Sequence, residues 1–246
     1  MGKQDTEKQW KTLLQYIEKH IASPRKEKLI SMYEKLADRV LTAPASSHFD
    51  RHNCFPGGYI DHVNRVVECA INLYVTWKTL GADMSTYTLE EVVFSAINHD
   101  LGKVGSKTEE YYIPNDSKWH VEKGQYYKIN PKLNFMKVPD RSLHTLQEFG
   151  IQVSENEFLA IKLHDGLYAK GNESYLMPGS TDFSLKTDLP ILVHHADHLA
   201  TLIESAIKRK PEEVIVETKP KSKMSSVNNP AVDDSLKNAF DQIFGA

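Results

Sequence analysis

The segment FSAINHDLGKVG, residues 94–105, places a histidine and an aspartate side by side, with a glycine and a lysine following. Apolar residues precede the pair at helical spacing, so His99 and Asp100 are predicted to lie at the end of a buried helix that Gly102 closes. Such a pair can simply finish a helix, or it can bind a metal ion. The choice depends on whether the rest of the chain supplies further ligands.

Composition describes an ordinary globular protein. The chain has 246 residues, of which 40% are hydrophobic and 26% are charged, so it can bury a sizeable core. Its net charge of −3 argues against broad binding to nucleic acid. No apolar run approaches the roughly 20 residues that span a bilayer, and the N-terminus is polar, so neither membrane insertion nor secretion is expected. Two cysteines are too few for a disulfide framework, which favours a reduced, cytoplasmic protein.

Hydrophobic periodicity predicts a mainly helical chain. Helices are expected within residues 6–42, interrupted near Ser23-Pro24, and then at 59–80, 89–99, 140–149, 154–165 and 188–209. The aromatic and polar stretch 105–138 is predicted to be an insertion of short strands or loops. The expected organisation is N-terminal helices that pack on the core (1–45), a main domain with the insertion (46–210), and a linker with a short C-terminal helix (211–246).

Inward-facing histidine or aspartate residues occur on four separate predicted helices. They are His62, the pair His99-Asp100, His164 and Asp197, each in line with apolar neighbours three or four positions away. A single histidine on an apolar face is usually a core residue with a local partner, and a single aspartate usually forms a salt bridge. One shared cation satisfies all of these side chains at once, whereas separate partners require four coincidences. The sequence therefore predicts a metal site.

The remaining histidines carry a weaker signal. His144 has polar helical neighbours, so it either lines a wet cleft or is simply exposed. His194, His195 and His198 surround Asp197 on one predicted helix, and they point in different directions. They cannot all be ligands of the same ion.

This order of residues resembles the HD superfamily of metal-dependent phosphohydrolases, which are all-helical. The resemblance covers about residues 48–205 and is strongest in HNCFPGGYIDHVNRVVECA (52–70) and FSAINHDLGKVG (94–105). The first stretch and ADHLATLIE (196–204) are similar to the HD domain of YhaM-type 3′–5′ exoribonucleases, and the chain as a whole is similar to HD proteins of tailed phages. The fold that this resemblance implies is an all-α HD-domain helical bundle with a small inserted hairpin or loop flap.

The resemblance also implies a set of metal ligands: His62, His99, Asp100, His144, His164 and Asp197. A one-ion site would use His62, His99, Asp100 and Asp197, and two-ion members of the superfamily add the other two histidines. Those members often have a His-His pair where this chain has His164 followed by Asp165, which departs from the two-ion pattern. The expected cofactor is one or two divalent transition metal ions, chosen from Mn, Fe, Co, Ni and Zn.

The implied activity is hydrolysis of a phosphate ester by a metal-activated water. Asp100 would bridge the ions if two are bound. Lys103 is placed to offset phosphate charge, or is a solvated lysine near a helix C-terminus. Arg65 either clamps a phosphate or forms an ion pair with Asp61. The expected substrate is a small nucleotide or a short oligonucleotide, and the sequence leaves the oligomeric state open.

Aromatic residues of the insertion are predicted either to stack on a nucleobase or to pack a small satellite core: Tyr111, Tyr112, Trp119, His120, Tyr126 and Tyr127. No counterpart is expected for the OB-fold domain that precedes the HD domain in YhaM-type enzymes, which argues against a processive RNA nuclease. Two alternative functions stay open. An HD-type mixed-valence di-iron oxygenase uses the same ligand order, and a non-catalytic HD binding module keeps the fold without turnover.

Overall fold

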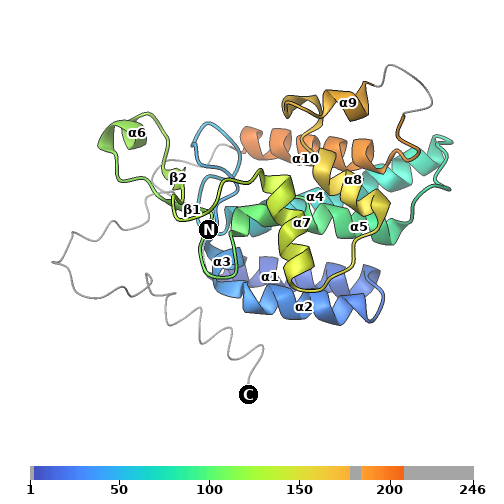
Figure 1. Cartoon of the computed structure of the whole chain (residues 1–246), viewed down its shortest axis with the longest axis horizontal. Coiled ribbons are helices and arrows are strands. Elements are labelled where there is room, and N and C mark those ends of the chain that lie inside the picture. The colour runs from blue at the N-terminus through green and yellow to red at the C-terminus, as the bar shows by residue number, and fades with distance from the viewer. Residues whose placement is uncertain (1–2, 178–183, 208–246) are drawn as a thin grey trace.

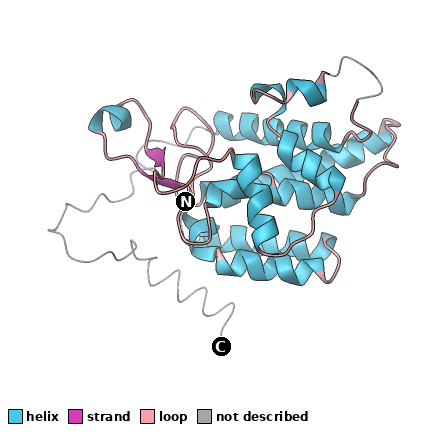
Figure 2. Ribbon diagram, viewed as in Figure 1, coloured by secondary structure: helices cyan, strands magenta, loops and turns pink. Residues whose placement is uncertain are grey.

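The computed structural model describes residues 3–177 and 184–207, and the predicted linker and C-terminal helix lie outside these ranges. The described chain is mostly helical, with one two-stranded sheet, as Figure 2 shows. The elements are α1 (Lys3–His20), α2 (Arg25–Lys35), α3 (Ala37–Thr42), α4 (Gly58–Thr79), α5 (Leu89–Asn98), a 3₁₀ helix (Leu101–Val104), β1 (Tyr112–Pro114), α6 (Lys118–Glu122), β2 (Tyr127–Ile129), α7 (Val138–Glu148), α8 (Glu155–Leu163), a second 3₁₀ helix (Gly166–Tyr168), α9 (Glu173–Leu176) and α10 (Leu189–Ala206). The expectation of an all-α protein is confirmed, whereas the HD architecture itself stays a prediction.

Helix α4 is the centre of the bundle. It packs against α10 on one side and α5 on another, and α8 contacts both α5 and α10 (Figure 1). Helices α1 and α2 lie side by side, with α1 against α4 and α5. The predicted long helices agree closely with the observed ones because their apolar faces are long enough to set a period. Sequence periodicity missed α6 and α9, which are too short to show one.

The turn before α4 is built around glycine. Gly57 has a φ of +79°, and a Cβ atom on Gly58 would lie 2.1 Å from the backbone oxygen of Asn53. The Asn53 amide donates to Asp61 Oδ2 (2.9 Å) in the first turn of the helix. The chain therefore folds back tightly onto the start of α4, and this places His52 beside that helix.

The end of α5 differs from the sequence prediction. Thr88 and Glu91 form a capping box that starts the helix, which ends at Asn98, before His99. Gly102 does not close α5: it lies in the following 3₁₀ helix, where a Cβ atom would meet the backbone oxygen of Val138 at 2.3 Å. Glycine is required there because α7 approaches so closely, and helix termination is not the reason.

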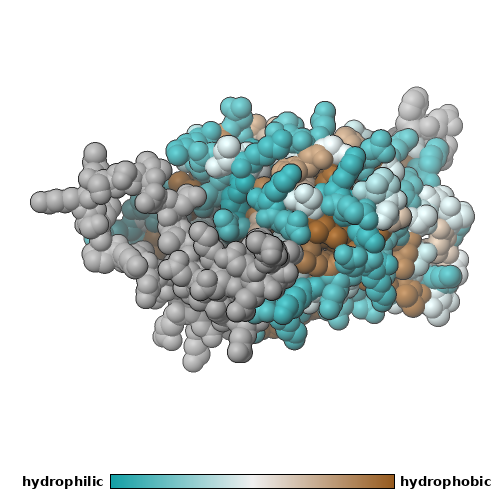
Figure 3. All heavy atoms as spheres, turned by 90° about the horizontal axis from the view of Figure 1, so that it is seen from below, coloured by the Kyte–Doolittle hydropathy of each residue, from teal (hydrophilic) through white to brown (hydrophobic). Residues whose placement is uncertain are grey.

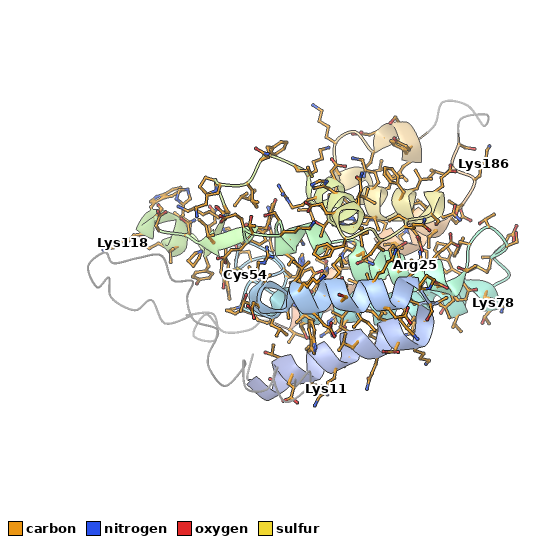
Figure 4. All side chains as sticks on the ribbon, turned by 60° about the horizontal axis from the view of Figure 1, so that its bottom comes forward. Lys11, Arg25, Cys54, Lys78, Lys118 and Lys186 are labelled. Carbon is orange, nitrogen blue, oxygen red and sulfur yellow. The ribbon has the colours of Figure 1, made fainter. Side chains whose placement is uncertain are left out.

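Arg25 ties α2 to the helices that carry two of the predicted ligands. Its guanidinium contacts the carboxylate of Glu157 on α8 (2.7 Å) and that of Glu90 on α5 (2.5 Å). Glu157 is fully buried, so it needs this cation. Figure 4 labels Arg25 within the helical body. The ion pairs fix α5 and α8 relative to each other, and His99 and His164 follow at the C-terminal ends of those helices.

The predicted insertion contains a β-hairpin. Strands β1 and β2 pair antiparallel, with Ile113 opposite Lys128, and α6 lies between them in the chain. In Figure 4, Lys118 marks the outer end of this region and Cys54 lies where it meets the helical body. Backbone hydrogen bonds fasten the hairpin to residues 47–49, from Phe49 N–H to the Gly124 oxygen (2.7 Å) and from Tyr127 N–H to the Ser47 oxygen (3.2 Å).

On the face seen in Figure 3, hydrophilic residues cover most of the coloured part, with hydrophobic areas between them. Within the described ranges, every helix is too short or too polar to cross a membrane. This agrees with the prediction of no membrane-spanning segment.

Candidate metal centre

Three predicted ligand histidines come together, and the outer ring nitrogen of each is held by an acceptor. His62 Nδ1 lies 3.0 Å from Glu204 Oε2, His99 Nδ1 lies 2.7 Å from the Ala96 oxygen, and His164 Nδ1 lies 2.8 Å from the Ile161 oxygen. A carbonyl or carboxylate acceptor requires a proton on Nδ1, which leaves Nε2 of each ring for another partner. Outer partners of this kind orient metal-binding histidines.

The Nε2 atoms converge on two aspartates. Asp100 Oδ2 lies 3.4 Å from His99 Nε2 and 3.6 Å from His62 Nε2, while its other oxygen lies 3.6 Å from His164 Nε2. Asp197 Oδ1 lies 3.1 Å from His62 Nε2 and 3.8 Å from His99 Nε2. The five side chains form one cluster contributed by α4, α10 and the ends of α5 and α8, and all but Asp197 are buried.

The donor atoms of the cluster fit a divalent transition metal ion. The Nε2 atoms of His62 and His99 are shielded from solvent and have no hydrogen-bond partner among the described residues. Neighbouring ligands of an ion with bonds of about 2.1 Å lie roughly 3.0–3.4 Å apart, close to the observed separations. Imidazole and carboxylate donors together suit Mn, Fe, Co, Ni or Zn. The His, Asp and Glu groups can therefore hold a metal ion.

Charge balance in the metal-free cluster depends on protons. Burial lowers the pKa of His62, but Glu204 and Asp197 outweigh it and raise that pKa to about 10. Burial also opposes the rise for His164, whose pKa reaches about 9 because of Asp100 and Asp165. The pKa of Asp100 falls well below its usual value despite burial, chiefly because of Lys103 and His99. Protonated imidazoles thus compensate the carboxylates until a cation replaces those protons.

Lys103 belongs to the cluster, as its predicted phosphate role requires. Its ammonium lies 2.5 Å from Asp100 Oδ2, and its side chain is only 14% exposed. Burial lowers the pKa of Lys103, but the carboxylate of Asp100 outweighs burial and raises it. The alternative of a solvated lysine is wrong, because this side chain turns inward.

Arg65 lies behind His62, on the Nδ1 side of the ring. Its Nε atom is 3.2 Å from Glu204 Oε1, and the guanidinium is 3.9 Å from Asp61 Oδ2. Glu204 separates Arg65 from His62, so the guanidinium does not reach the Nε2 side where a phosphate would meet the cluster. Of the two predicted roles, the ion pair with Asp61 is present, and Arg65 also neutralises a carboxylate that orients His62, whereas the phosphate clamp stays a prediction.

His144 is not brought to the cluster. Its side chain is 51% exposed and lies 3.9 Å from Glu148. The buried face of α7 is formed by other residues, among them Ser142 and Leu146, so His144 points away. The sequence left two positions open for His144, a wet cleft or the exterior. The structure places it at the surface, where it lines a pocket together with Leu143 and Phe158.

Sequence reasoning missed two residues of the site, Glu204 and His52. Glu204 follows Asp197 by seven positions, two helical turns along α10, so helical spacing carries a signal for it. His52 lies in an irregular turn, where no periodicity marks a buried side. Its ring centroid is 4.6 Å from that of His62, and its Nε2 atom is shielded from solvent. Burial, together with the charge of His62, lowers the pKa of His52 to about 2.

The aromatic residues of the insertion mainly pack a small satellite core. Tyr111 and Tyr127 are buried, and Tyr112 contacts both, with ring centroids 4.8 and 6.5 Å away. Burial raises the pKa of Tyr112 to about 12, while nearby Lys103 opposes that rise. Tyr112 is thus within electrostatic reach of the cluster. Trp119, in contrast, is 62% exposed.

Comparison with known proteins gives no relative for this site. No protein-family model matches the chain, and neither a curated protein nor a solved structure matches it. A functional assignment therefore rests on the residues of the cluster and on their chemistry.

Proposed function

We propose that this protein is a metal-dependent phosphohydrolase of the HD type, acting on a nucleotide or a short phosphodiester. One observation carries the proposal: three buried imidazoles have Nδ1 held by an acceptor and turn Nε2 toward Asp100 and Asp197. In the metal-free chain, protons on the imidazoles compensate the carboxylates. A divalent cation can replace those protons, because the same nitrogen and oxygen atoms are metal ligands.

We further propose one tightly bound ion per chain. The donors form two overlapping groups that share His99, one with His62 and Asp100 and the other with His164 and Asp197. His144, which a two-ion site would use, lies elsewhere. Two ions held equally tightly would need more donors than the cluster provides.

When bound, the ion would supply an acidified water and a Lewis acid for the phosphoryl group. The residues of the chain have separate roles around it. Lys103 keeps a buried positive charge beside Asp100, where it can attract a phosphoryl oxygen. Asp197 is the most exposed of the five donor side chains, at 19%, so solvent and substrate reach the cluster from its side.

The proposed substrate class follows from size and charge. Once a divalent ion is bound, the positive charges of the ion and of Lys103 attract an anion to the cluster. The chain as a whole has a net charge of −3. Local attraction of a small phosphate compound fits this distribution, and extended binding along a nucleic acid does not. A mononucleotide or a short oligonucleotide is therefore the class to test.

The test is a hydrolysis screen on protein whose metal content is known. The full chain is stripped with a chelator, reloaded with Mn, Fe, Co, Ni or Zn, and assayed with nucleoside mono-, di- and triphosphates, cyclic nucleotides and short oligonucleotides. Metal-dependent release of phosphate or nucleotide is expected, and Asp100→Asn should abolish it. Two irons per chain together with oxygen consumption would contradict the proposal and favour the oxygenase alternative. Metal binding without turnover of any substrate would favour the binding module.

A further inference from the structure

His52 has a buried hydrogen-bonding atom that nothing in the described chain satisfies. Its Nε2 atom is shielded from solvent and lacks a partner among the described residues. The ring of His52 packs against that of His62, whose own Nε2 atom is unpaired in the same way. A buried polar atom without a partner is unfavourable, and sites that bind ligands are where such atoms are kept.

The position of His52 is fixed by its surroundings. Ser46 Oγ donates to the His52 oxygen (2.7 Å), and Ala45 N–H donates to the Asn53 oxygen (3.1 Å). The turn continues through Gly58, where no side chain fits. The ring of His52 packs on that of His62 at 4.6 Å with a tilt of 37°. The turn therefore holds this imidazole beside the cluster before any ligand arrives.

A second metal position at His52 is a poor explanation. His52, His62 and Glu204 lie close enough to be grouped as ligands. Both oxygens of Glu204 are already engaged, however, one by His62 Nδ1 (3.0 Å) and one by Arg65 Nε (3.2 Å). The guanidinium would repel a cation at that point, and the carboxylate has no free charge to attract one. The unpaired nitrogen of His52 is left for a different kind of partner.

We propose that His52 contacts the substrate: its ring nitrogen donates a hydrogen bond to a phosphoryl oxygen of the compound held at the cluster. The inference rests on the proposed function, which places a phosphate there. A neutral imidazole N–H donates to an anion without adding charge to a cluster that already contains Lys103 and a metal ion. Residues 47–49 of the same loop are bonded to the hairpin, so His52 would also link the insertion to the substrate.

The experiment measures binding of inorganic phosphate and of metal to the full-length chain. His52→Phe keeps a flat ring but removes the nitrogen, His52→Gln restores an N–H donor, and His20→Phe on α1 is the matched control. Cobalt affinity is measured by chelator competition, and phosphate affinity of the cobalt-loaded protein by calorimetry. We expect His52→Phe to weaken phosphate binding by about tenfold with unchanged cobalt affinity, and His52→Gln to recover part of the loss.

Each result has a distinct meaning. Phosphate affinity within about twofold of wild type in His52→Phe overturns the inference, because a hydrogen bond to an anion is worth more than that. A tenfold loss of cobalt affinity in that variant, on the scale of a lost metal contact, overturns it by making His52 a ligand. Absence of phosphate binding to the wild-type protein overturns it as well. If phosphate binds and depends on His52 but no ester is hydrolysed, the inference stands and the proposed function fails.

Discussion

The metal cluster and the hairpin insertion (residues 105–138) are built in different ways. Each histidine of the cluster is held through Nδ1 by an acceptor behind it, and its Nε2 atom faces the aspartates. The hairpin is held by a short ladder, a few backbone bonds to residues 47–49 and some ring contacts. Trp119 and Phe135 in that region are 62% and 92% exposed.

The difference indicates where the chain tolerates change. A buried set of charges is strongly destabilising when one member is removed, because the others lose their compensation. Exposed side chains on a hairpin contribute little to folding, and such regions open locally at a small free energy. We therefore expect the cluster to determine metal binding and catalysis. The insertion should modulate substrate access while leaving the metal in place.

The largest effect is expected from Asp100→Asn. The substitution keeps the shape of the side chain but removes the charge that Lys103 and the imidazoles compensate, so metal binding and hydrolysis should both be lost. The metal-free variant should also be destabilised by about 3–5 kcal/mol, because Lys103 stays buried without its partner. The control is Asp116→Asn in the hairpin, where the carboxylate is 79% exposed and pairs with Lys128. Metal analysis, activity and thermal unfolding of both variants make the comparison, and retained activity in Asp100→Asn would remove the cluster from the mechanism.

A smaller effect is expected from Glu204→Gln. The amide cannot accept hydrogen bonds from both His62 and Arg65 as the carboxylate does. The ring of His62 should therefore be less well oriented, and its Nε2 atom should be less basic. Loss of an outer partner typically lowers metal affinity about 10- to 100-fold. The measurement is chelator competition with cobalt, with Glu122→Gln on α6 as the matched control. Equal affinities in the two variants would show that Glu204 does not act on the metal.

The metal-induced gain in stability should depend on pH. In the metal-free protein the pKa of His62 is raised to about 10 and that of His164 to about 9, above the value near 6.5 of an unfolded histidine. The bound protons contribute to the free energy of unfolding of the metal-free protein. This contribution is fully present below about pH 6.5 and is lost as the pH rises through about 9 to 10. A metal ion must displace the same protons, so its affinity rises with pH. Thermal unfolding between about pH 6 and 8.5 should show a metal-induced Tm increase that grows with pH, and a constant or shrinking increase would contradict this assignment.

The smallest effect is expected in the hairpin. Trp119→Ala removes an exposed ring that contacts His120, so the free energy of unfolding should change by no more than about 0.5 kcal/mol. Cobalt affinity should be the same as that of the wild type, and an effect on activity should appear in KM and leave kcat unchanged. Denaturant unfolding and steady-state kinetics check these expectations. Loss of metal from this variant would show that the hairpin and the metal cluster are coupled. It would contradict the expectation that changes in the hairpin leave the metal in place.

The sequence predicted the helices and the inward-facing His and Asp side chains that lie together, because both depend on helical spacing; that these side chains bind a metal stays a prediction. An inward-facing side chain such as His62 or Asp197 is marked by the apolar residues one turn away. His144 has no such mark, and the structure places it outside the cluster. The partner of Arg65 could not be predicted, since it comes from α10, far along the chain. His52 needed the structure most, because an irregular turn gives no periodic signal.

The central claim is that the buried His and Asp cluster binds one metal ion. Its most direct test is a crystal structure of the cobalt-loaded full chain, with anomalous scattering used to count and locate the metal. We expect one strong peak bounded by Nε2 of His62 and His99 and by the carboxylates of Asp100 and Asp197, with cobalt content near one ion per chain in solution. A chain that binds no cobalt in this cluster, or one whose strongest peak lies elsewhere, would contradict it.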